Sequence, residues 1–191
     1  MAPRLHLLCA ASTSSVSSIA FAADEPLDAR GRASLARLTG RLPSCQLVLR
    51  GPALRAAQTA EGLALDAGVE AMLRDCDFGR WAGRSLAQIQ AEEPEAVADW
   101  LQNPRAAPHG GESFADVMTR VGGWMDGLLA VNRSVLAVTH PTVIRAAIAY
   151  TVGTGPEAFR HIDVAPLTRT TLSGGGGRWT LTGLVPLKDE R

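Results

Sequence analysis

The residues that could do chemistry in this chain lie at the starts of predicted helices and in two loops. His140 directly follows the apolar run 134–139 and begins a helix, and Arg55 lies in the first turn of another helix. Free backbone N–H groups at helix starts attract anions, so this placement favours an anion-binding site at Arg55 and His140. Asp75 and Glu112 lie in loops that could cover the site. His140, Asp75 and Glu112 are therefore the candidate acid–base residues.

Three apolar runs must position these residues. Residues 5–9, 46–49 and 134–139 are compact and apolar, as expected of strands that are buried on both faces. The turns that follow them are 9–13, 50–52 and 140–141. In a parallel sheet such turns meet at the carboxyl edge, where ligands bind. We therefore expect one site that is built from these three turns.

Helix-like segments alternate with the strands. They cover residues 28–42, 54–67, 85–101 (interrupted at Pro94), 113–129 and 142–151. Gly68 is placed to end the second of them, and Ser113 with Asp116 resembles a capping box. Residues 170–172 and 179–184 are strand-like, and the glycine run 174–177 between them suits a hairpin. This order predicts a mostly parallel sheet with helices on both faces and an antiparallel addition at the C-terminus.

Composition limits the possible partners. The formal net charge is zero, with 19 basic and 19 acidic residues among 191. Such a balance leaves no excess of positive charge that would attract nucleic acid or an anionic membrane surface. No apolar run approaches the roughly 20 residues that a membrane span requires. The placement of Arg55 and His140 favours a small anionic ligand instead, such as a phosphorylated one.

The cysteine content and the N-terminal sequence indicate the cellular compartment. Cys9, Cys45 and Cys76 have no metal-site spacing, and an odd number of cysteines in a long chain fits a reducing cytoplasm. A secretory signal is a minor alternative, because residues 20–22 (AFA) resemble a cleavage site. The apolar run before it is short and contains His6. We therefore expect a cytoplasmic protein without a metal or cofactor.

Five segments in order resemble the blocks of the histidine phosphatase superfamily, the phosphoglycerate mutase-like proteins. They are 26–33 (PLDARGRA), 50–61 (RGPALRAAQTAE), 73–83 (LRDCDFGRWAG), 110–113 (GGES) and 137–147 (AVTHPTVIRAA). The resemblance implies a three-layer α/β/α sandwich and a single domain over residues 1–191. It places Arg55 at the family's phosphate-binding arginine and His140 at its second active-site histidine.

The first family block departs from the pattern. The family's first strand ends in R-H-G-x-T, and its histidine attacks phosphorus. Aligned on Thr13, this motif falls on CAAST, with Cys9 at the arginine and Ala10 at the nucleophile. The methyl group of Ala10 has no lone pair and cannot form a phosphoenzyme. Asp75 stands at the family's proton-donating glutamate and is one methylene shorter.

Further residues belong to the expected ligand site. Cys9, Ala10, Ser12 and Thr13 form the loop where phosphate would lie, and two less certain members are Arg50 and Trp81. Arg50 replaces a serine of the family and could restore positive charge, although a solvated role is favoured. The loop of Trp81 adjoins the expected cleft.

Three functions remain open from the sequence. The first is a family member that has lost phosphohistidine chemistry and binds an anionic ligand or a protein partner. The second is an enzyme repurposed for other acid–base chemistry with His140 and Asp75. The third is a residual phosphomonoester hydrolase that uses His140 or Cys9. The cysteine route lacks a phosphate cradle, because no arginine follows Cys9 before Arg30.

Overall fold

A computed structural model describes residues 2–38 and 42–187. Its centre is a six-stranded sheet with the order β3-β2-β4-β1-β5-β6. The strands are β1 (Arg4–Cys9), β2 (Leu47–Arg50), β3 (Gly68–Val69), β4 (Ser134–Thr139), β5 (Thr168–Gly175) and β6 (Arg178–Pro186). The four strands from β3 to β1 are parallel, and β5 and β6 add antiparallel pairs. The predicted mixed sheet is confirmed.

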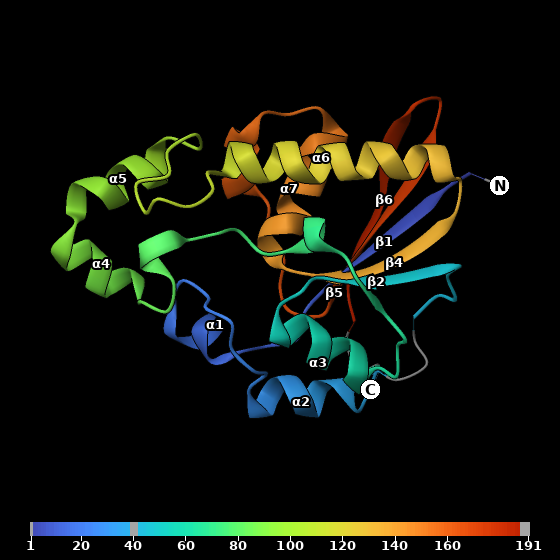
Figure 1. The fold of residues 1–191 in the computed structure, drawn as a ribbon, viewed down its shortest axis with the longest axis horizontal. Helices are drawn as coiled ribbons and strands as arrows, with labels where there is room; N and C mark the ends of the chain where they lie inside the picture. Colours follow the sequence, from blue (N-terminus) through green and yellow to red (C-terminus); the bar gives the residue numbers. More distant parts are fainter. Residues whose placement is uncertain (1, 39–41, 188–191) are drawn as a thin grey trace.

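Helices cover both faces of the sheet (Figure 1). On one side lie α6 (Phe114–Val131) and α7 (Pro141–Val152), and on the other lie α2 (Ala29–Leu35) and α3 (Leu54–Gly62). Leu7 and Ala137 pack in the core under the first pair, whereas Leu8 and Val138 pack under the second. Neighbouring residues of one strand thus enter opposite cores, because side chains alternate along a strand. This arrangement confirms the three-layer α/β/α sandwich.

A smaller group of elements extends from one end of the sheet (Figure 1). It contains α1 (Ser14–Ser18), α4 (Leu86–Glu92), α5 (Pro94–Gln102) and the short 3-10 helix η2 (Gly79–Trp81). Two other 3-10 helices lie against the main body: η1 (Ala71–Leu73) contacts α6 and β4, and η3 (Pro156–His161) contacts α6 and α7. Phe21, Trp81, Ile89 and Val97 form its own apolar cluster. Trp81 is fully buried there.

Several predicted boundaries differ from the structure. The helix predicted over 54–67 ends at Gly62, and Gly68 begins the short edge strand β3 instead of ending a helix. The helix predicted over 28–42 covers only Ala29–Leu35, and residues 39–41 lie outside the described part. The capping box at Ser113 is confirmed, since its side chain accepts from the Asp116 N–H and Asp116 accepts from the Ser113 N–H.

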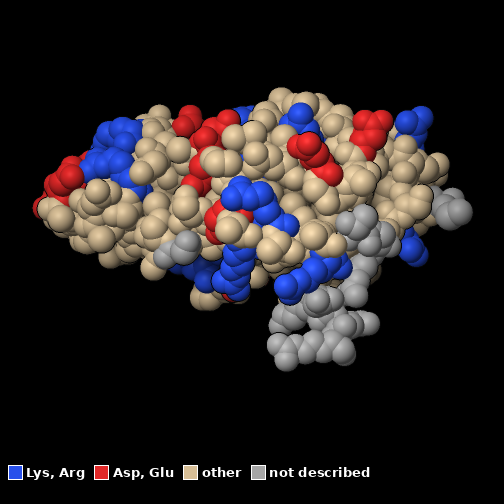
Figure 2. Space-filling model, turned by 90° about the horizontal axis from the view of Figure 1, so that it is seen from below, with Lys and Arg blue, Asp and Glu red and all other residues tan. Residues whose placement is uncertain are grey.

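Surface charge matches the neutral composition. Figure 2 shows basic and acidic side chains interspersed on one face of the molecule. Among residues 2–38 and 42–187, no helix combines the length and the apolar character that crossing a membrane would take.

Candidate ligand site

The three predicted turns meet at the carboxyl edge of the sheet. Cys9 pairs with Thr139 in the parallel register of β1 and β4, and the Ala10 N–H donates to the Thr139 carbonyl over 2.8 Å. Ala10 and His140 follow these paired residues, so they lie side by side. Gly51, in the turn that follows β2, lies close to the His140 ring as well. A methyl group in place of its hydrogen would be 3.2 Å from His140 Nε2.

Arg55 connects the catalytic candidates to one another. Its Nε donates to His140 Nδ1 over 3.0 Å, and another guanidinium nitrogen lies 2.6 Å from Asp75 Oδ2. The third nitrogen donates to the Ala23 carbonyl over 2.8 Å. Every nitrogen of the Arg55 guanidinium therefore already has a protein acceptor. The sequence predicted that these three side chains would meet, and the structure brings them together.

His140 is a neutral imidazole in this arrangement. Its side chain is fully buried, and burial together with the Arg55 charge lowers its pKa to about 4, although Asp75 opposes the shift. Since Nδ1 accepts from Arg55, the ring proton lies on Nε2. His140 Nε2 is buried and has no hydrogen-bond partner among the described residues.

Asp75 stays ionised beside it. Burial raises the pKa of this carboxyl, but His140 in its protonated form, the Arg55 guanidinium and the Cys76 backbone N–H outweigh that effect and hold the pKa below its usual range. Asp75 and Arg55 therefore form a buried ion pair, and the positive charge of Arg55 is largely balanced within the protein.

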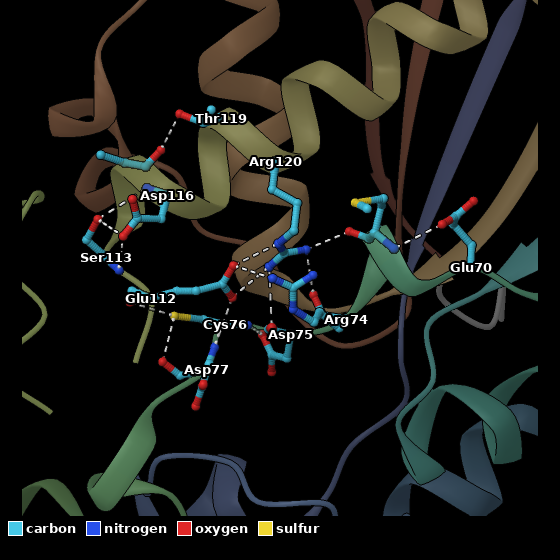
Figure 3. Close-up of polar contacts among 12 residues, drawn as sticks. Glu70, Arg74, Asp75, Cys76, Asp77, Glu112, Ser113, Asp116, Thr119 and Arg120 are labelled. Carbon is cyan, nitrogen blue, oxygen red and sulfur yellow. Dashed lines mark hydrogen bonds and ion pairs between the residues drawn. The ribbon is translucent and has the colours of Figure 1, made fainter. Parts of the chain in front are cut away.

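Glu112 belongs to a neighbouring ionic network (Figure 3). Its carboxylate accepts from Arg74 over 2.8 Å and from two nitrogens of Arg120, each over 2.9 Å. Arg120 also donates to the Met72 carbonyl over 2.6 Å and so anchors the loop that carries Asp75. Glu112 positions this loop and does not line the cavity described next.

A cavity of about 340 Å³ opens beside Ala10. Of the predicted site residues, its wall contains Cys9, Ala10, Thr13, Arg55 and Asp75. The cavity wall does not include Glu112, the buried His140, or three further predicted residues, which are Ser12, Arg50 and Trp81. Ser12 donates to Asp28, Arg50 donates to the Gly51 carbonyl, and Trp81 is buried in the aromatic cluster.

Sequence reasoning missed much of the cavity wall. Phe21, Trp100, Phe114 and Phe159 line it, as does Arg145. One signal could have found Arg145, because it follows Pro141 by four residues and so lies on the same face of α7. The aromatic residues come from four separate segments, and no local spacing links them.

The Cys9 thiol does not have the properties of a nucleophile. Burial, with a smaller contribution from the Asp75 charge, raises its pKa to about 12. A protonated, buried thiol reacts poorly, since the thiolate is the attacking form. Within the described part of the chain, no cluster of three or more His, Cys, Asp or Glu side chains is arranged to hold a metal ion.

The fold is that of a known protein superfamily. The chain matches the family model of the histidine phosphatase superfamily (branch 1) over residues 7–185, and it belongs to that superfamily. It is 36% identical over 129 residues to a bifunctional protein of Mycobacterium tuberculosis, which covers 63% of this chain. The matched segment spans only 35% of that relative.

Solved structures agree with this assignment. The alpha-ribazole phosphatase of Shigella flexneri is 25% identical with a TM-score of 0.84, and the match covers 96% of each chain. A mycobacterial glucosyl-3-phosphoglycerate phosphatase in complex with inorganic phosphate is 28% identical with a TM-score of 0.78, covering 94% of this chain and 95% of its own. Structural neighbours of this chain are thus phosphatases.

The neutral His140 predicts acid sensitivity. An unfolded histidine has a pKa near 6.5, so the unfolded chain binds a proton between about pH 6.5 and 4 while the folded chain does not. The free energy of unfolding should therefore fall by about 2 kcal/mol from pH 7 to pH 4.5 through this residue. The stabilisation from Asp75 is lost only at lower pH, because its folded pKa lies below its usual value.

Urea unfolding at pH 7 and pH 4.5 measures this effect. His140→Gln should flatten the pH dependence, leaving the smaller contributions of His6 and His109, whose pKa values burial also lowers. His161→Gln is the matched control, because His161 is exposed. An equally steep dependence in His140→Gln and wild type would contradict a neutral His140.

Proposed function

We propose that this chain is a histidine phosphatase superfamily member that forms no phosphohistidine and binds a small anionic ligand at the carboxyl edge of its sheet. The observation that carries the proposal is Ala10 beside His140 at the paired ends of β1 and β4. A residue that attacks phosphorus needs a free lone pair at this place, and Ala10 supplies a methyl group.

The remaining groups support binding more than phosphoryl transfer. Catalysis of that transfer depends on cations that are free to hold the charge of the moving group. Here Arg55 is paired with Asp75, and His140 is neutral at pH 7. The start of α7 still favours an anion, because His140 makes no side-chain cap hydrogen bond and Pro141 and Thr142 line the cavity.

The two alternative functions have less support. Acid–base chemistry by His140 requires contact with a substrate, and this side chain is fully buried and outside the cavity wall. Hydrolysis through Cys9 requires a thiolate, and the pKa of Cys9 is raised. We therefore favour a ligand-binding role over both.

Hydrolysis of p-nitrophenyl phosphate tests the proposal. The mycobacterial glucosyl-3-phosphoglycerate phosphatase serves as the active comparison in the same buffer. We expect no release of phosphate by the wild-type chain above the buffer rate, and no covalently bound phosphate after an alkaline quench. Turnover that disappears in His140→Gln would overturn the proposal and favour a residual hydrolase.

A further inference from the structure

The cavity beside Ala10 has two chemically different ends. Ala10, Thr13 and Arg55 line it at the strand ends. The same wall contains four aromatic side chains that contact one another, Phe21, Trp100, Phe114 and Phe159. Pockets of about 300 Å³ and more with such walls hold small organic molecules. Inorganic phosphate alone would leave the aromatic end empty.

The aromatic wall is closely packed around one cation. Phe114 and Phe159 stack with their ring centres 3.7 Å apart and their planes at 19°. The Arg145 guanidinium carbon lies 5.1 Å from the centre of the Phe159 ring. A flat aromatic ligand against these rings also reaches the guanidinium, because Arg145 lies against the Phe159 ring.

Arg145 still has a free donor. Its Nε is buried and has no hydrogen-bond partner in the described part of the chain. Its ion pair to Asp163 is long, at 3.5 Å, and the Asp163 side chain is 93% exposed. The Arg145 side chain is 28% exposed and lines the cavity, so a ligand there reaches the terminal guanidinium nitrogens. Arg55, by contrast, has a protein acceptor on each of its three nitrogens.

The charges of the wall limit the charge of the ligand. The cavity is lined by two cations, Arg55 and Arg145, and by one anion, Asp75. One positive charge is therefore in excess, and it belongs to Arg145, because Arg55 and Asp75 form an ion pair. A singly charged carboxylate matches this excess better than a phosphate monoester, which carries nearly two charges at neutral pH.

The mouth of the cavity is apolar as well. Val16 and Ile19, which line it from α1 and its C-terminal end, are 53% and 71% exposed. Ile19 has the left-handed φ of 50°, a conformation that a β-branched residue rarely adopts. Strained residues of this kind often mark a binding site. An aliphatic side chain held in this way extends the apolar wall toward solvent.

We propose that this cavity binds a small aromatic carboxylate, with its carboxylate on Arg145 and its rings against Phe114 and Phe159. The proposal rests on the proposed function, since it names the class of ligand that the same site takes. It also identifies Arg145 rather than Arg55 as the residue that holds the negative charge.

Calorimetric titration of the full chain at pH 7 tests the ligand class. The probes are 2-naphthoate, its neutral analogue 2-naphthamide, and inorganic phosphate. We expect 2-naphthoate to bind at least tenfold more tightly than either of the others, because only it has both the rings and the single charge. Tighter binding of phosphate, or equal binding of 2-naphthamide, would overturn the proposal.

Variants of the wall test the assigned residues. Arg145→Gln should weaken 2-naphthoate binding by about tenfold or more, and Phe159→Leu should weaken it severalfold.

Arg133→Gln is the control, because Arg133 is exposed at the opposite end of β4 and should leave binding unchanged. Ile19→Asn should weaken binding without lowering the melting temperature, since Asn tolerates the left-handed conformation. Unchanged binding in Arg145→Gln would exclude this cation.

The two proposals fail in different ways. Release of phosphate from an aryl phosphate by the wild-type chain would overturn the proposed function, whatever the titrations show. Absence of 2-naphthoate binding together with absence of turnover would overturn only the proposed ligand class. Melting curves of each variant establish that a loss of binding is not a loss of folding.

Discussion

The triple variant Cys9→Arg/Ala10→His/Ala11→Gly is expected to hydrolyse p-nitrophenyl phosphate at least about 10³-fold faster than the wild-type chain. A histidine at position 10 would lie beside His140 at the paired strand ends and supply the missing lone pair. Removal of a single nucleophile lowers the rate of a hydrolase by about 10⁶, so restoring one should give a large gain even in an imperfect site.

The site has room for these changes. Ala10 and Cys9 both line the cavity, so larger side chains at their positions can extend into it. An arginine at position 9 would add a cation that Asp75 does not fully neutralise, because Asp75 is already paired with Arg55. Such a cation would stabilise charge on the transferring group.

A matched variant separates nucleophilic attack from other effects. Cys9→Arg/Ala10→Gln/Ala11→Gly has the same added charge and a similar volume, but its amide does not attack phosphorus. Only the histidine variant should release phosphate and hold covalent phosphate after an alkaline quench. Equal rates in the two variants would show that position 10 does not carry the chemistry, and a folded but inactive histidine variant would contradict our account of the site.

The sequence predicted the central sheet because buried parallel strands leave a strong pattern. Residues 5–9 and 134–139 are uninterrupted apolar runs, and they became β1 and β4 with nearly the same bounds. Short edge elements have no such pattern. The two residues of β3 form a strand only because they pair with Leu49 and Arg50, and Ala64 takes a left-handed φ of 55° in the turn before them.

The same reasoning explains which site residues were predicted. Arg55 and His140 were found because strand ends and helix starts meet by topology, and their meeting needs no side-chain detail. Glu112 did not reach the cavity, since Arg74 and Arg120 neutralise it elsewhere. The position of Arg145 against Phe159 depends on how η3 packs on α7. That packing includes the stacking of Phe159 on Phe114, which is distant in the chain, and a single sequence does not show it.

Arg55→Met should lower the free energy of unfolding by about 3–5 kcal/mol, which corresponds to a fall in melting temperature of roughly 10 °C. The substitution retains most of the side-chain volume, so the loss is electrostatic in origin. It leaves the Asp75 carboxylate without its cation and His140 Nδ1 without its donor, both in a buried setting. Chemical unfolding at pH 7 gives the measurement.

Two further variants identify the cause of that loss. Arg50→Met is the control, because the half-buried Arg50 guanidinium donates to the Gly51 carbonyl alone among the described residues and should contribute under about 1 kcal/mol. Asp75→Asn in the Arg55→Met background should recover part of the stability, since it removes the unpaired charge. If Arg55→Met and Arg50→Met cost the same, the ion pair contributes nothing. A large coupling between Arg55 and Asp75 would instead show that this arginine now serves the fold, which leaves Arg145 as the cation available to a ligand.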